Sequence, residues 1–522
     1  MANNPRSELI FLEPCLLRIS FISRGTEQFG GKDNSIRVED TNDKGSSRSG
    51  LSSRSIITFC NLNGPPSTLF LPPGSSDGDS FPPGLTGESY DHAAPSTEAA
   101  SYQRNSCGYC KSDNGSASYY ASSVSVRPAH YEALVNRGWR RSGTLYYKQN
   151  LQRSCCPHYT MRLDASAFTP RKDQRKAINR WNKFVLGPEY IRRAAYLCPK
   201  TREEKKRRKC NFDLLGAVHE AEYSNVKRPI DPKTKRPLEP AHRFEVNLEG
   251  DSISQAKYEL FLKYQTKVHK EDASKWANKD FKRFLCSGMT RSPANAAKSD
   301  EKKLGSWHQC YRLDGKLIAV AVLDLMPNGV SSVYIFYDPE FEQWEFGKLS
   351  AMREIAFAIE AQYQYYYMGY YIHSCQKMRY KGTFRPQYIL DPESHTWDPL
   401  DGELSRKLDE RPYVSLSRDR QTSTTTGDDN AATQEADTEI NDEEVSLFDL
   451  NMPGNMTLDE VKALDLDHWL LLVHGTFVHM IDLVGWEKMP IDNPQSVKGI
   501  IAELAAVLGP EVVKNSAVVL FD

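Results

Sequence analysis

Three apolar stretches in the second half of the chain have the composition of neighbouring β-strands. They cover residues 307–313, 317–325 and 330–337 and are rich in β-branched and aromatic side chains. An Asp-Gly pair separates the first two stretches, and Pro-Asn-Gly separates the last two. Because Asn and Gly tolerate the positive φ angles of tight turns, the pattern predicts an antiparallel meander of three strands.

A helix and a further strand are predicted after the meander. Apolar residues recur at helical spacing between Leu349 and Tyr363, and an aromatic run covers residues 367–374. Three antiparallel strands, a helix and another strand form the central unit of the GNAT acyltransferase fold. We therefore expect an α+β protein with a GNAT-like domain over residues 241–416.

Polar segments predict where this domain ends and what surrounds it. Residues 1–104 are rich in Ser, Gly, Asn and Pro, and residues 417–445 in Thr, Asp, Glu and Ala, so both are expected to be disordered. Residues 201–240 combine Lys and Pro and predict a basic, irregular linker. This division leaves a cysteine-rich N-terminal domain at 105–200 and a small C-terminal appendage at 446–522.

The charges nearly cancel over the whole chain, with 67 Lys and Arg against 68 Asp and Glu. They are nevertheless unevenly distributed, because basic residues crowd the region 137–302 and acidic residues the region 409–444. A basic middle region indicates an anionic partner better than the net charge of -1 does.

The location of the protein is predicted from its apolar runs and its cysteines. The best apolar runs, 9–22 and 469–484, are interrupted by charged or polar residues, so no membrane span is expected. The chain start lacks the basic region and cleavage site of a secretory signal. Eleven cysteines, several of them clustered, fit a reducing compartment, so we expect a cytoplasmic or nuclear protein.

Four cysteines form a candidate metal site. Cys107 and Cys110 have the Cys-x-x-Cys spacing that presents two thiolates to one metal, and Cys155 and Cys156 follow about 45 residues later. Four thiolates suit zinc or an iron–sulfur cluster. Adjacent side chains diverge in an extended chain, so His158 could replace one member of the second pair. The alternative is a chance Cys-x-x-Cys among buried cysteines.

Basic residues between the two cysteine pairs predict a nucleic-acid contact. Trp139, Arg140 and Arg141 lie in the sequence RGWRRSG, and cations beside an aromatic ring can meet phosphates and stack on a base. Basic residues also line two predicted helices, at 171–186 and 254–270. Together they favour an RNA partner, although solvated helix faces and a core tryptophan would explain the same residues.

The predicted GNAT-like unit places a cleft between its last two strands. The helix that begins near Gly347 would aim free N–H groups at a phosphate there. The loop 343–349 has only one glycine, which argues against coenzyme A and leaves room for another phosphate-bearing acyl donor. His373 and Asp338 are the candidate bases. The candidate substrate-binding residues are Tyr337, Gly347, Lys377, Arg379, Tyr380 and Lys381.

Several sequence blocks between Cys107 and about Pro399 resemble the arginyl-tRNA–protein transferases. In chain order they read CGYC, RGWRRSG, CCPHYTMRL, HRFEVNLE, KYELFLKYQTKVH, YRLDGKLIAVAVLDLMPNGVSSVYIFYDP, GKLSAMREI and YYYMGYYIHSCQKMRYKGTFRP. The first hundred residues and those beyond about 417 lie outside the resemblance.

The resemblance implies a two-part enzyme with a cysteine-bound metal or cluster and a GNAT-like domain. Its donor would be arginyl-tRNA, and its acceptor the α-amine of a protein that begins with Asp, Glu or oxidised cysteine. The arginylated product would be recognised by a ubiquitin ligase. The family cysteines important for activity match Cys107, Cys110, Cys155 and Cys156. Two rival interpretations are an acetyltransferase that uses acetyl coenzyme A and a non-catalytic tRNA-binding zinc protein.

Overall fold

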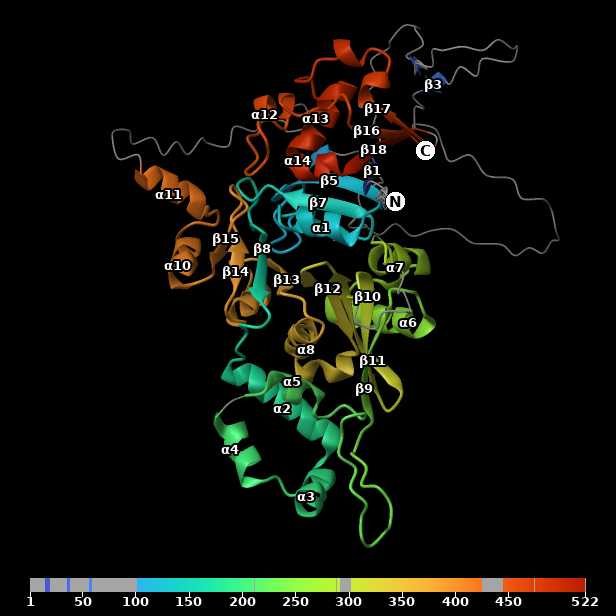
Figure 1. Ribbon diagram of the computed structural model, residues 1–522, viewed down its shortest axis with the longest axis vertical. Helices are drawn as coiled ribbons and strands as arrows, with labels where there is room; N and C mark the ends of the chain where they lie inside the picture. Colours follow the sequence, from blue (N-terminus) through green and yellow to red (C-terminus); the bar gives the residue numbers. More distant parts are fainter. Residues whose placement is uncertain are drawn as a thin grey trace, which may run out of the picture.

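Two eight-stranded sheets form the fold, one in the upper part of Figure 1 and one across its middle. The structure is a computed structural model. It describes residues 15–18, 35–37, 56–58, 101–210, 212–287, 289–291, 302–424, 445–473 and 475–521. Most of the predicted N-terminal extension, and residues 425–444 of the predicted acidic linker, therefore lie outside the described residues.

The first sheet is assembled from both ends of the described chain. Its strand order is β17-β16-β18-β1-β5-β7-β6, with β4 paired to β5. Strand β1 pairs in parallel with β18 and antiparallel with β5, so it joins C-terminal and N-terminal residues in one sheet. The strands are β1 Cys15–Arg18, β4 Ser101–Asn105, β5 Ser116–Ser125, β6 Arg140–Ser142, β7 Leu145–Gln149, β16 Leu470–Val473, β17 Thr476–His479 and β18 Ser516–Phe521.

One hydrophobic core covers this sheet and the helices around it. The helices are α1 Pro128–Val135, α12 Leu458–Lys462, α13 Val497–Leu508 and α14 Pro510–Lys514. Helix α13 is buried around most of its circumference and packs in the same core as Tyr119 and Trp139. The residues predicted as a separate appendage, 446–522, therefore share a core with the cysteine-rich region. An almost wholly apolar helix needs cover on all sides, which explains why it does not stand alone.

The second sheet contains the predicted meander. Its order is β15-β14-β8-β13-β12-β11-β10-β9, and β10, β11 and β12 pair antiparallel in sequence, which confirms the prediction. Asp314 and Gly315 form the first turn with positive φ angles of 51° and 82°. The strands are β8 Tyr159–Asp164, β9 Phe244–Gly250, β10 Gly305–Leu313, β11 Lys316–Leu325, β12 Gly329–Tyr337, β13 Tyr365–Tyr371, β14 Tyr388–Leu390 and β15 Trp397–Pro399.

Strands β12 and β13 pair only at their first residues and then separate. Their parallel ladder ends at Ser331 opposite Tyr367, and Gly369 follows with a φ of 77°. Helix α8, Phe346–Glu360, connects the two strands and buries Leu349, Met352 and Ile355 against the sheet. The helix and the splay of the two strands were both predicted from the sequence.

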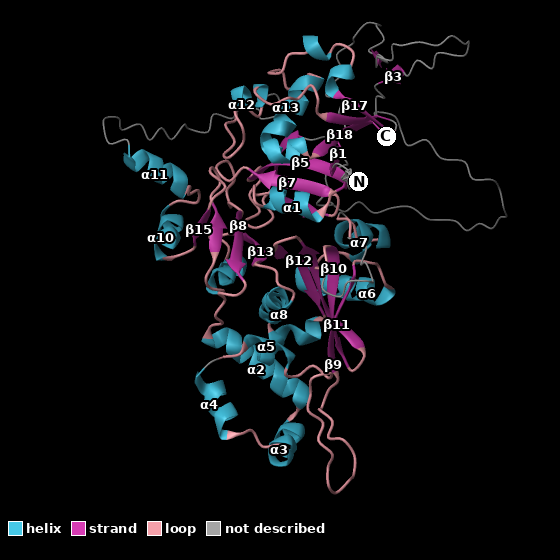
Figure 2. Ribbon diagram, viewed as in Figure 1, coloured by secondary structure: helices cyan, strands magenta, loops and turns pink. Residues whose placement is uncertain are grey.

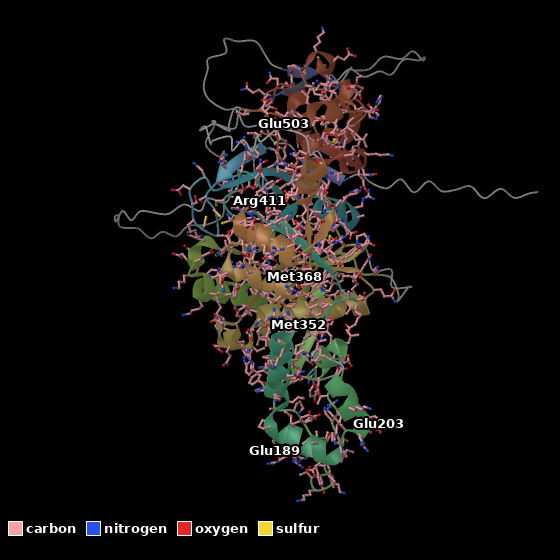
Figure 3. All side chains as sticks on the ribbon, turned by 90° about the vertical axis from the view of Figure 1, so that its left-hand side faces the viewer. Glu189, Glu203, Met352, Met368, Arg411 and Glu503 are labelled. Carbon is pink, nitrogen blue, oxygen red and sulfur yellow. The ribbon has the colours of Figure 1, made fainter. Side chains whose placement is uncertain are left out.

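The remaining helices lie around the second sheet. Figure 3 shows Met352 and Met368 near the middle of the molecule, with Glu189 and Glu203 at one end and Glu503 toward the other. The helices are α2 Lys172–Leu186, α3 Pro188–Leu197, α4 Arg202–Cys210, α5 Leu214–His219, α6 Gln255–Tyr264, α7 Asn278–Leu285, α9 Gln376–Arg379, α10 Gly402–Glu410 and α11 Leu416–Thr424, with a π-helix at Gln265–His269 and 3-10 helices at Ala273–Lys275, Pro339–Trp344, Tyr380–Thr383, Met480–Asp482 and Trp486–Lys488. A separate pair of strands, β2 Ser35–Arg37 and β3 Ile56–Thr58, completes the described elements.

Several segment boundaries differ from those predicted. The cysteine-rich region 105–200 is divided between the two sheets, because β8 pairs with β13 and helix α2 packs near α8. Two helices, α4 and α5, form within the predicted irregular linker 201–240, and α11 includes the start of the predicted acidic linker. Among the described residues, no helix combines the length and apolarity that crossing a bilayer requires.

Candidate metal centre and active site

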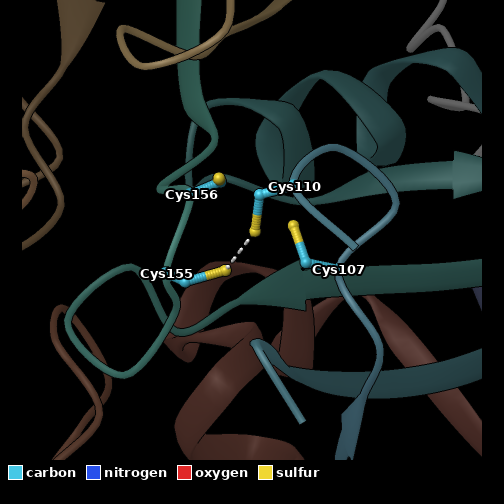
Figure 4. A group of neighbouring side chains, drawn as sticks. All are labelled: Cys107, Cys110, Cys155 and Cys156. Atoms are coloured by element: carbon cyan, nitrogen blue, oxygen red, sulfur yellow. Dashed lines mark hydrogen bonds between the residues drawn. The ribbon is translucent and has the colours of Figure 1, made fainter. Parts of the chain in front are cut away.

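Four cysteines meet at the edge of the first sheet. One sulfur each from Cys107, Cys110, Cys155 and Cys156 lies within 4.8 Å of the others. The Sγ atoms of Cys110 and Cys155 are 3.3 Å apart, and Figure 4 shows all four side chains turned toward one another. The predicted grouping of the four cysteines is confirmed, and their geometry is that of a site for a thiophilic metal.

Backbone hydrogen bonds shape the loops that carry the four sulfurs. The N–H of Cys107 donates to the carbonyl of Ser112 at 2.9 Å, and the N–H of Lys111 donates to the carbonyl of Cys107 at 2.9 Å. The N–H of Cys155 donates to the carbonyl of Gly115, which ties the second pair to the first loop. Cys155 and Cys156 lie in a bend rather than a strand, so their side chains converge instead of diverging.

Gly115 is required by the close approach of Cys155. A Cβ at position 115 would lie 2.7 Å from the Cys155 sulfur, whereas a Cβ at Gly108 in the same loop would meet no atom within 4 Å.

Hydrogen bonds from the Ser112 backbone and from Cys155 lower the pKa of Cys110 from 9.0 to about 7. A thiol with this pKa is readily deprotonated, as a metal ligand must be.

His158 lies beside the cluster but outside the four-sulfur group. Its ring packs between Tyr109 and Tyr370, with ring centres 5.0 and 5.1 Å away. Burial, with a smaller contribution from the charge of Lys381, lowers the pKa of His158 to about 4. The ring thus connects the Cys107–Cys110 loop with strand β13 by packing.

The cysteine cluster lies directly against the end of strand β13. Cys107 and Cys156 are buried with Ile372, and Cys375 and Met378 pack on the same group. The hydroxyl of Ser374 lies 3.6 Å from the Cys156 sulfur. The predicted metal site and the predicted active segment 373–381 are therefore one continuous structure.

His373 lies in a cavity of about 350 Å³ at this strand end. Its Nδ1 is 2.7 Å from the Tyr371 hydroxyl, and its Nε2 is 2.7 Å from a carboxylate oxygen of Asp409. The cavity lining includes Arg379 and Arg411, whose guanidinium groups pair with Asp409 and Asp419 respectively. The cavity thus combines a histidine with two arginines that have acidic partners.

The three cations predicted to act together point in different directions. Arg379 turns toward the His373 cavity, whereas Lys377 is exposed and its charge acts on His269. Lys381 turns inward and donates from Nζ to the carbonyl of Tyr370 at 3.0 Å. Helix α9 and the 3-10 helix after it rotate successive side chains around the axis, which explains why the three cations separate.

Lys381 occupies the splay between β12 and β13. A Cβ at Gly369 would lie 3.7 Å from both Lys381 Nζ and the carbonyl of Ser332, so the amine lies beside Gly369, where β13 separates from β12. Arg140 reaches the same place, with Nη2 3.5 Å from the carbonyl of Gly369. Burial, and then the charge of Arg140, lower the pKa of Lys381 from 10.5 to about 8. The buried Arg140 and the half-buried Lys381 therefore both lie at the splay.

Three further predicted residues gather at the start of helix α8. A Cβ at Gly347 would lie 3.4 Å from the Tyr380 hydroxyl, and the ring of Tyr337 stacks on Phe346 with centres 5.9 Å apart. Further along helix α8, the carboxyl of Glu354 accepts a hydrogen bond from the Tyr366 hydroxyl at 2.7 Å. Burial raises the pKa of Glu354, which sequence patterns did not single out.

Asp338 forms ion pairs with two lysines. It is 1% exposed, and its oxygens lie 2.7 Å from Lys263 Nζ and 2.9 Å from Lys316 Nζ. Burial alone would raise the pKa of Asp338, but hydrogen bonds from the two lysines outweigh it and the pKa is lowered. A carboxylate that is held ionised by two cations is a weak proton acceptor, so Asp338 is poorly suited to act as a base.

Two of the predicted RNA-binding residues are internal. Trp139 is fully buried and donates from Nε1 to the carbonyl of Val507. Arg141 makes a bidentate pair with the buried carboxylate of Asp324, at 2.6 and 2.8 Å. Both side chains hold the first sheet to its neighbours, and neither offers a surface to RNA. Only Arg140 of the three reaches the splay.

The sequence prediction missed Asp409 and Arg411. Both come from the end of helix α10 and the residues after it, more than 30 positions from His373. Their charges lie among many exposed ones in that stretch, so no local signal distinguishes them.

Comparisons with known proteins match two separate regions of this chain. The model described as the arginine-tRNA-protein transferase N terminus matches residues 105–176, and the model described as its C terminus matches residues 256–391. The first matched region carries the four cysteines, and the second carries the splayed strands and His373.

Named relatives agree with these matches. Arginyl-tRNA–protein transferase 1 of Arabidopsis thaliana is 28% identical over 60% of this chain and 74% of its own length. Its namesake in Saccharomyces cerevisiae is 33% identical, over 52% of this chain and 51% of its own length. The aspartate/glutamate leucyltransferase of Pseudomonas putida is 25% identical over 55% of this chain and 91% of its own length.

Among solved structures, that of L-PGS from Bacillus licheniformis aligns with 42% of this chain and 48% of its own, at 7% identity and a TM-score of 0.21. This score is too low to establish a shared fold. The two matched models follow one another in order along the chain, and relatives from plants and fungi carry the same family name. The chain thus carries both the region that matches the N-terminal model and the region that matches the C-terminal model of the arginine-tRNA–protein transferases.

Proposed function

We propose that this protein transfers arginine from arginyl-tRNA to the α-amine of acceptor proteins that begin with Asp or Glu. One observation carries the proposal. The four-cysteine centre of the N-terminal family region packs against the end of β13 in the C-terminal family region, beside the cavity of His373. The arginylated N-terminus would then mark the acceptor for a ubiquitin ligase in the cytoplasm.

The donor end of the tRNA is assigned to the splay between β12 and β13 of a GNAT-like domain. Arg140 and Lys381 supply positive charge there, and the N-terminus of α8 near Gly347 adds free N–H groups. A phosphate of the tRNA 3′ end would be held by these groups. Coenzyme A is not part of this proposal, because the start of α8 has a single glycine.

The acceptor is assigned to the cavity of His373. Its acidic first side chain would pair with Arg379 or Arg411, and its α-ammonium with Asp409. In the free protein these three side chains form ion pairs with partly exposed partners within the chain. An acceptor could therefore replace those partners at a modest cost in free energy. A cavity of this polarity would disfavour acceptors that begin with an apolar residue.

The reaction needs little from the protein beyond positioning and one proton acceptor. An α-amine has a pKa of about 7.7 to 8.0, so a useful fraction of it is unprotonated and nucleophilic at neutral pH. The amine attacks the ester carbonyl of arginyl-tRNA, an amide bond forms, and the ester bond to the ribose breaks. His373 would accept the proton lost by the amine and return it to the ribose oxygen. Positioning alone can lower the barrier by up to about 7 to 11 kcal/mol.

The four cysteines are proposed to hold a single metal ion such as zinc. Tetrahedral bonds of about 2.3 Å separate the ligand sulfurs by about 3.8 Å, in keeping with four sulfurs that lie within 4.8 Å of one another. A cluster in which each sulfur binds a different iron needs wider spacing. The bound ion would fix the loops that support residues 372–378, and its chemistry there is structural.

The test compares acceptors that differ only in their first residue. Purified protein is incubated with labelled arginyl-tRNA and with peptides that begin with Asp, Glu, Gly or Val. We expect labelling of the Asp and Glu peptides alone, and loss of labelling when the donor is treated with ribonuclease. Equal labelling of all four peptides would contradict the acidic-acceptor assignment, and labelling that survives ribonuclease would contradict the tRNA requirement.

A further inference from the structure

A second group of buried cations lies apart from the His373 cavity and the splay. Lys148 on β7 is 4% exposed, and its Nζ lies 3.0 Å from Asn455 Oδ1 and 3.5 Å from His395 Nε2. Arg137, which follows helix α1, donates from Nη2 to the carbonyl of Gly454. Among the described residues, no carboxylate lies within ion-pair distance of Lys148 or Arg137. Placing cations together in a protein interior without a counterion is costly.

These side chains line one small cavity with other polar groups that lack partners. The cavity is bounded by Arg137, Lys148, His158, Thr160 and His395. Three of its buried atoms have no hydrogen-bond partner among the described residues: Arg137 Nε, His158 Nε2 and Thr160 Oγ1. Asn455 accepts from Lys148 through Oδ1 and lies next to this lining, and its Nδ2 also has no partner among the described residues. Buried polar groups are normally satisfied, so three such atoms in one cavity lining need an explanation.

The chemistry of the lining identifies the occupant as an anion. Arg137 carries positive charge, Lys148 offers an amine that an anion would keep protonated, and Thr160 and His158 can both donate. The acidic groups whose charges act on Arg137 and His395 are Glu511 and Asp391, and neither forms an ion pair with them among the described residues. Asp391 is instead engaged by Ser415 and Ser417.

We infer that this cavity is a binding site for a monatomic anion of the chloride type. Its volume of about 20 Å³ is slightly more than one water molecule needs, which excludes phosphate, nucleotides and other polyatomic ligands. The buried environment strengthens the interaction of such an anion with the surrounding donors. Burial lowers the pKa of Lys148 well below its usual value, and a bound anion would restore its charge.

The anion would join three parts of the fold. Lys148 belongs to the first sheet, Thr160 to β8 of the second sheet, and His395 to the turn between β14 and β15. Asn455 belongs to the segment that enters the C-terminal helices. His158 also packs on Tyr109 and Tyr370, so the anion would support the contact between the cysteine loop and β13. The site lies outside the reacting groups and would act on stability.

The test measures thermal unfolding of the full chain in sodium phosphate, sodium chloride and sodium gluconate at equal ionic strength. Gluconate is too large for the cavity and serves as the reference. We expect the melting temperature to rise with the logarithm of chloride concentration above its value in gluconate, as binding to the folded state requires. In Lys148→Met this rise should disappear or require at least tenfold more chloride. The exposed control Lys172→Met should behave as the wild type.

The melting temperature of Lys148→Met in gluconate distinguishes a lysine that binds an anion from one that only stabilises the fold. In gluconate, Lys148→Met should melt at the same temperature as the wild type or higher, because it replaces a buried amine that has no counterion among the described residues with an apolar side chain. If Lys148→Met does not fold, Thr160→Val reports on the same cavity and should weaken the chloride effect at least threefold. Equal melting temperatures in chloride and gluconate, or a chloride effect that survives both substitutions, would overturn the inference. Stabilisation by phosphate without stabilisation by chloride would overturn it as well.

Discussion

The hydroxyl of Ser374 lies 3.6 Å from the sulfur of Cys156. Ser374 follows strand β13 of the C-terminal family region, and Cys156 belongs to the cysteine centre of the N-terminal family region. A change in the geometry of the cysteine centre would therefore act on the residue next to His373. On this basis we expect the state of the metal site to affect the proposed transfer reaction, although the cysteines themselves are not assigned a reacting role.

Gly115→Ala should impair the metal centre without removing a ligand. The added methyl group would lie 2.7 Å from the Cys155 sulfur and must displace it. We expect metal content after purification to fall and the transfer rate to fall with it, by about 10-fold or more, as is typical when the groups supporting a metal site are disturbed. Metal analysis and single-turnover kinetics measure both.

Gly108→Ala is the matched control in the same loop. Its added methyl group would meet no atom within 4 Å. Metal content and rate should equal those of the wild type. If Gly115→Ala also keeps full metal and full rate, the four sulfurs do not form the site described above.

Asp324→Asn should destabilise the fold strongly because it breaks the buried pair with Arg141. Removing one partner of a buried ion pair typically costs about 3–5 kcal/mol of unfolding free energy. Glu189→Gln, which breaks an exposed pair with Arg192, should cost less than about 1 kcal/mol. Chemical denaturation compares the two variants. A small loss of stability together with weaker tRNA binding would instead support the RNA contact that the sequence predicted for Arg141.

Binding of the tRNA 3′ end should depend on pH through Lys381. The pKa of this amine is lowered to about 8, so it is charged below pH 8 and loses its proton as pH rises through that value. Wild-type affinity for arginyl-tRNA should therefore decrease above pH 8. Lys381→Met should bind more weakly below pH 8 and match the wild type above it. Parallel curves for the two proteins across this range would show that Lys381 does not contact the donor.

Arg411→Ala should act on the acceptor and not on the donor. Loss of a charged hydrogen bond to the acidic first residue should raise the KM for Asp-initiated peptides by about 10-fold or more, equivalent to roughly 1.5–3 kcal/mol. The affinity for tRNA and its salt dependence should remain unchanged. A tRNA salt dependence that is smaller by about one unit would mean that Arg411 contacts phosphate instead.

The parts of this fold that local sequence determines were predicted well. The Asp-Gly and Pro-Asn-Gly turns define the meander, and the spacing from Leu349 to Tyr363 defines helix α8. The Cys-x-x-Cys spacing also identified half of the metal centre directly. Each of these signals lies within a short window, where the backbone preference of a few residues determines the outcome.

Contacts between distant segments could not be predicted in the same way. The pairing of β1 with β18 and of β8 with β13 depends on tertiary packing, which leaves no local pattern. The same holds for His373 and Asp409, which meet only after α10 folds back against the strand end. Arg141 illustrates the opposite error, because a basic sequence beside an aromatic residue predicts RNA binding, although its charge is neutralised by the buried Asp324.

The most direct test of the central claim is the mass of an Asp-initiated peptide after incubation with the protein and arginyl-tRNA. The account predicts that the peptide gains the mass of one arginine residue, that fragmentation places this residue on the α-amine, and that a peptide with an acetylated N-terminus gains nothing. Acetyl coenzyme A in place of arginyl-tRNA should leave the peptide unchanged. An unmodified peptide in the presence of intact arginyl-tRNA, or acetylation by acetyl coenzyme A, would contradict the account.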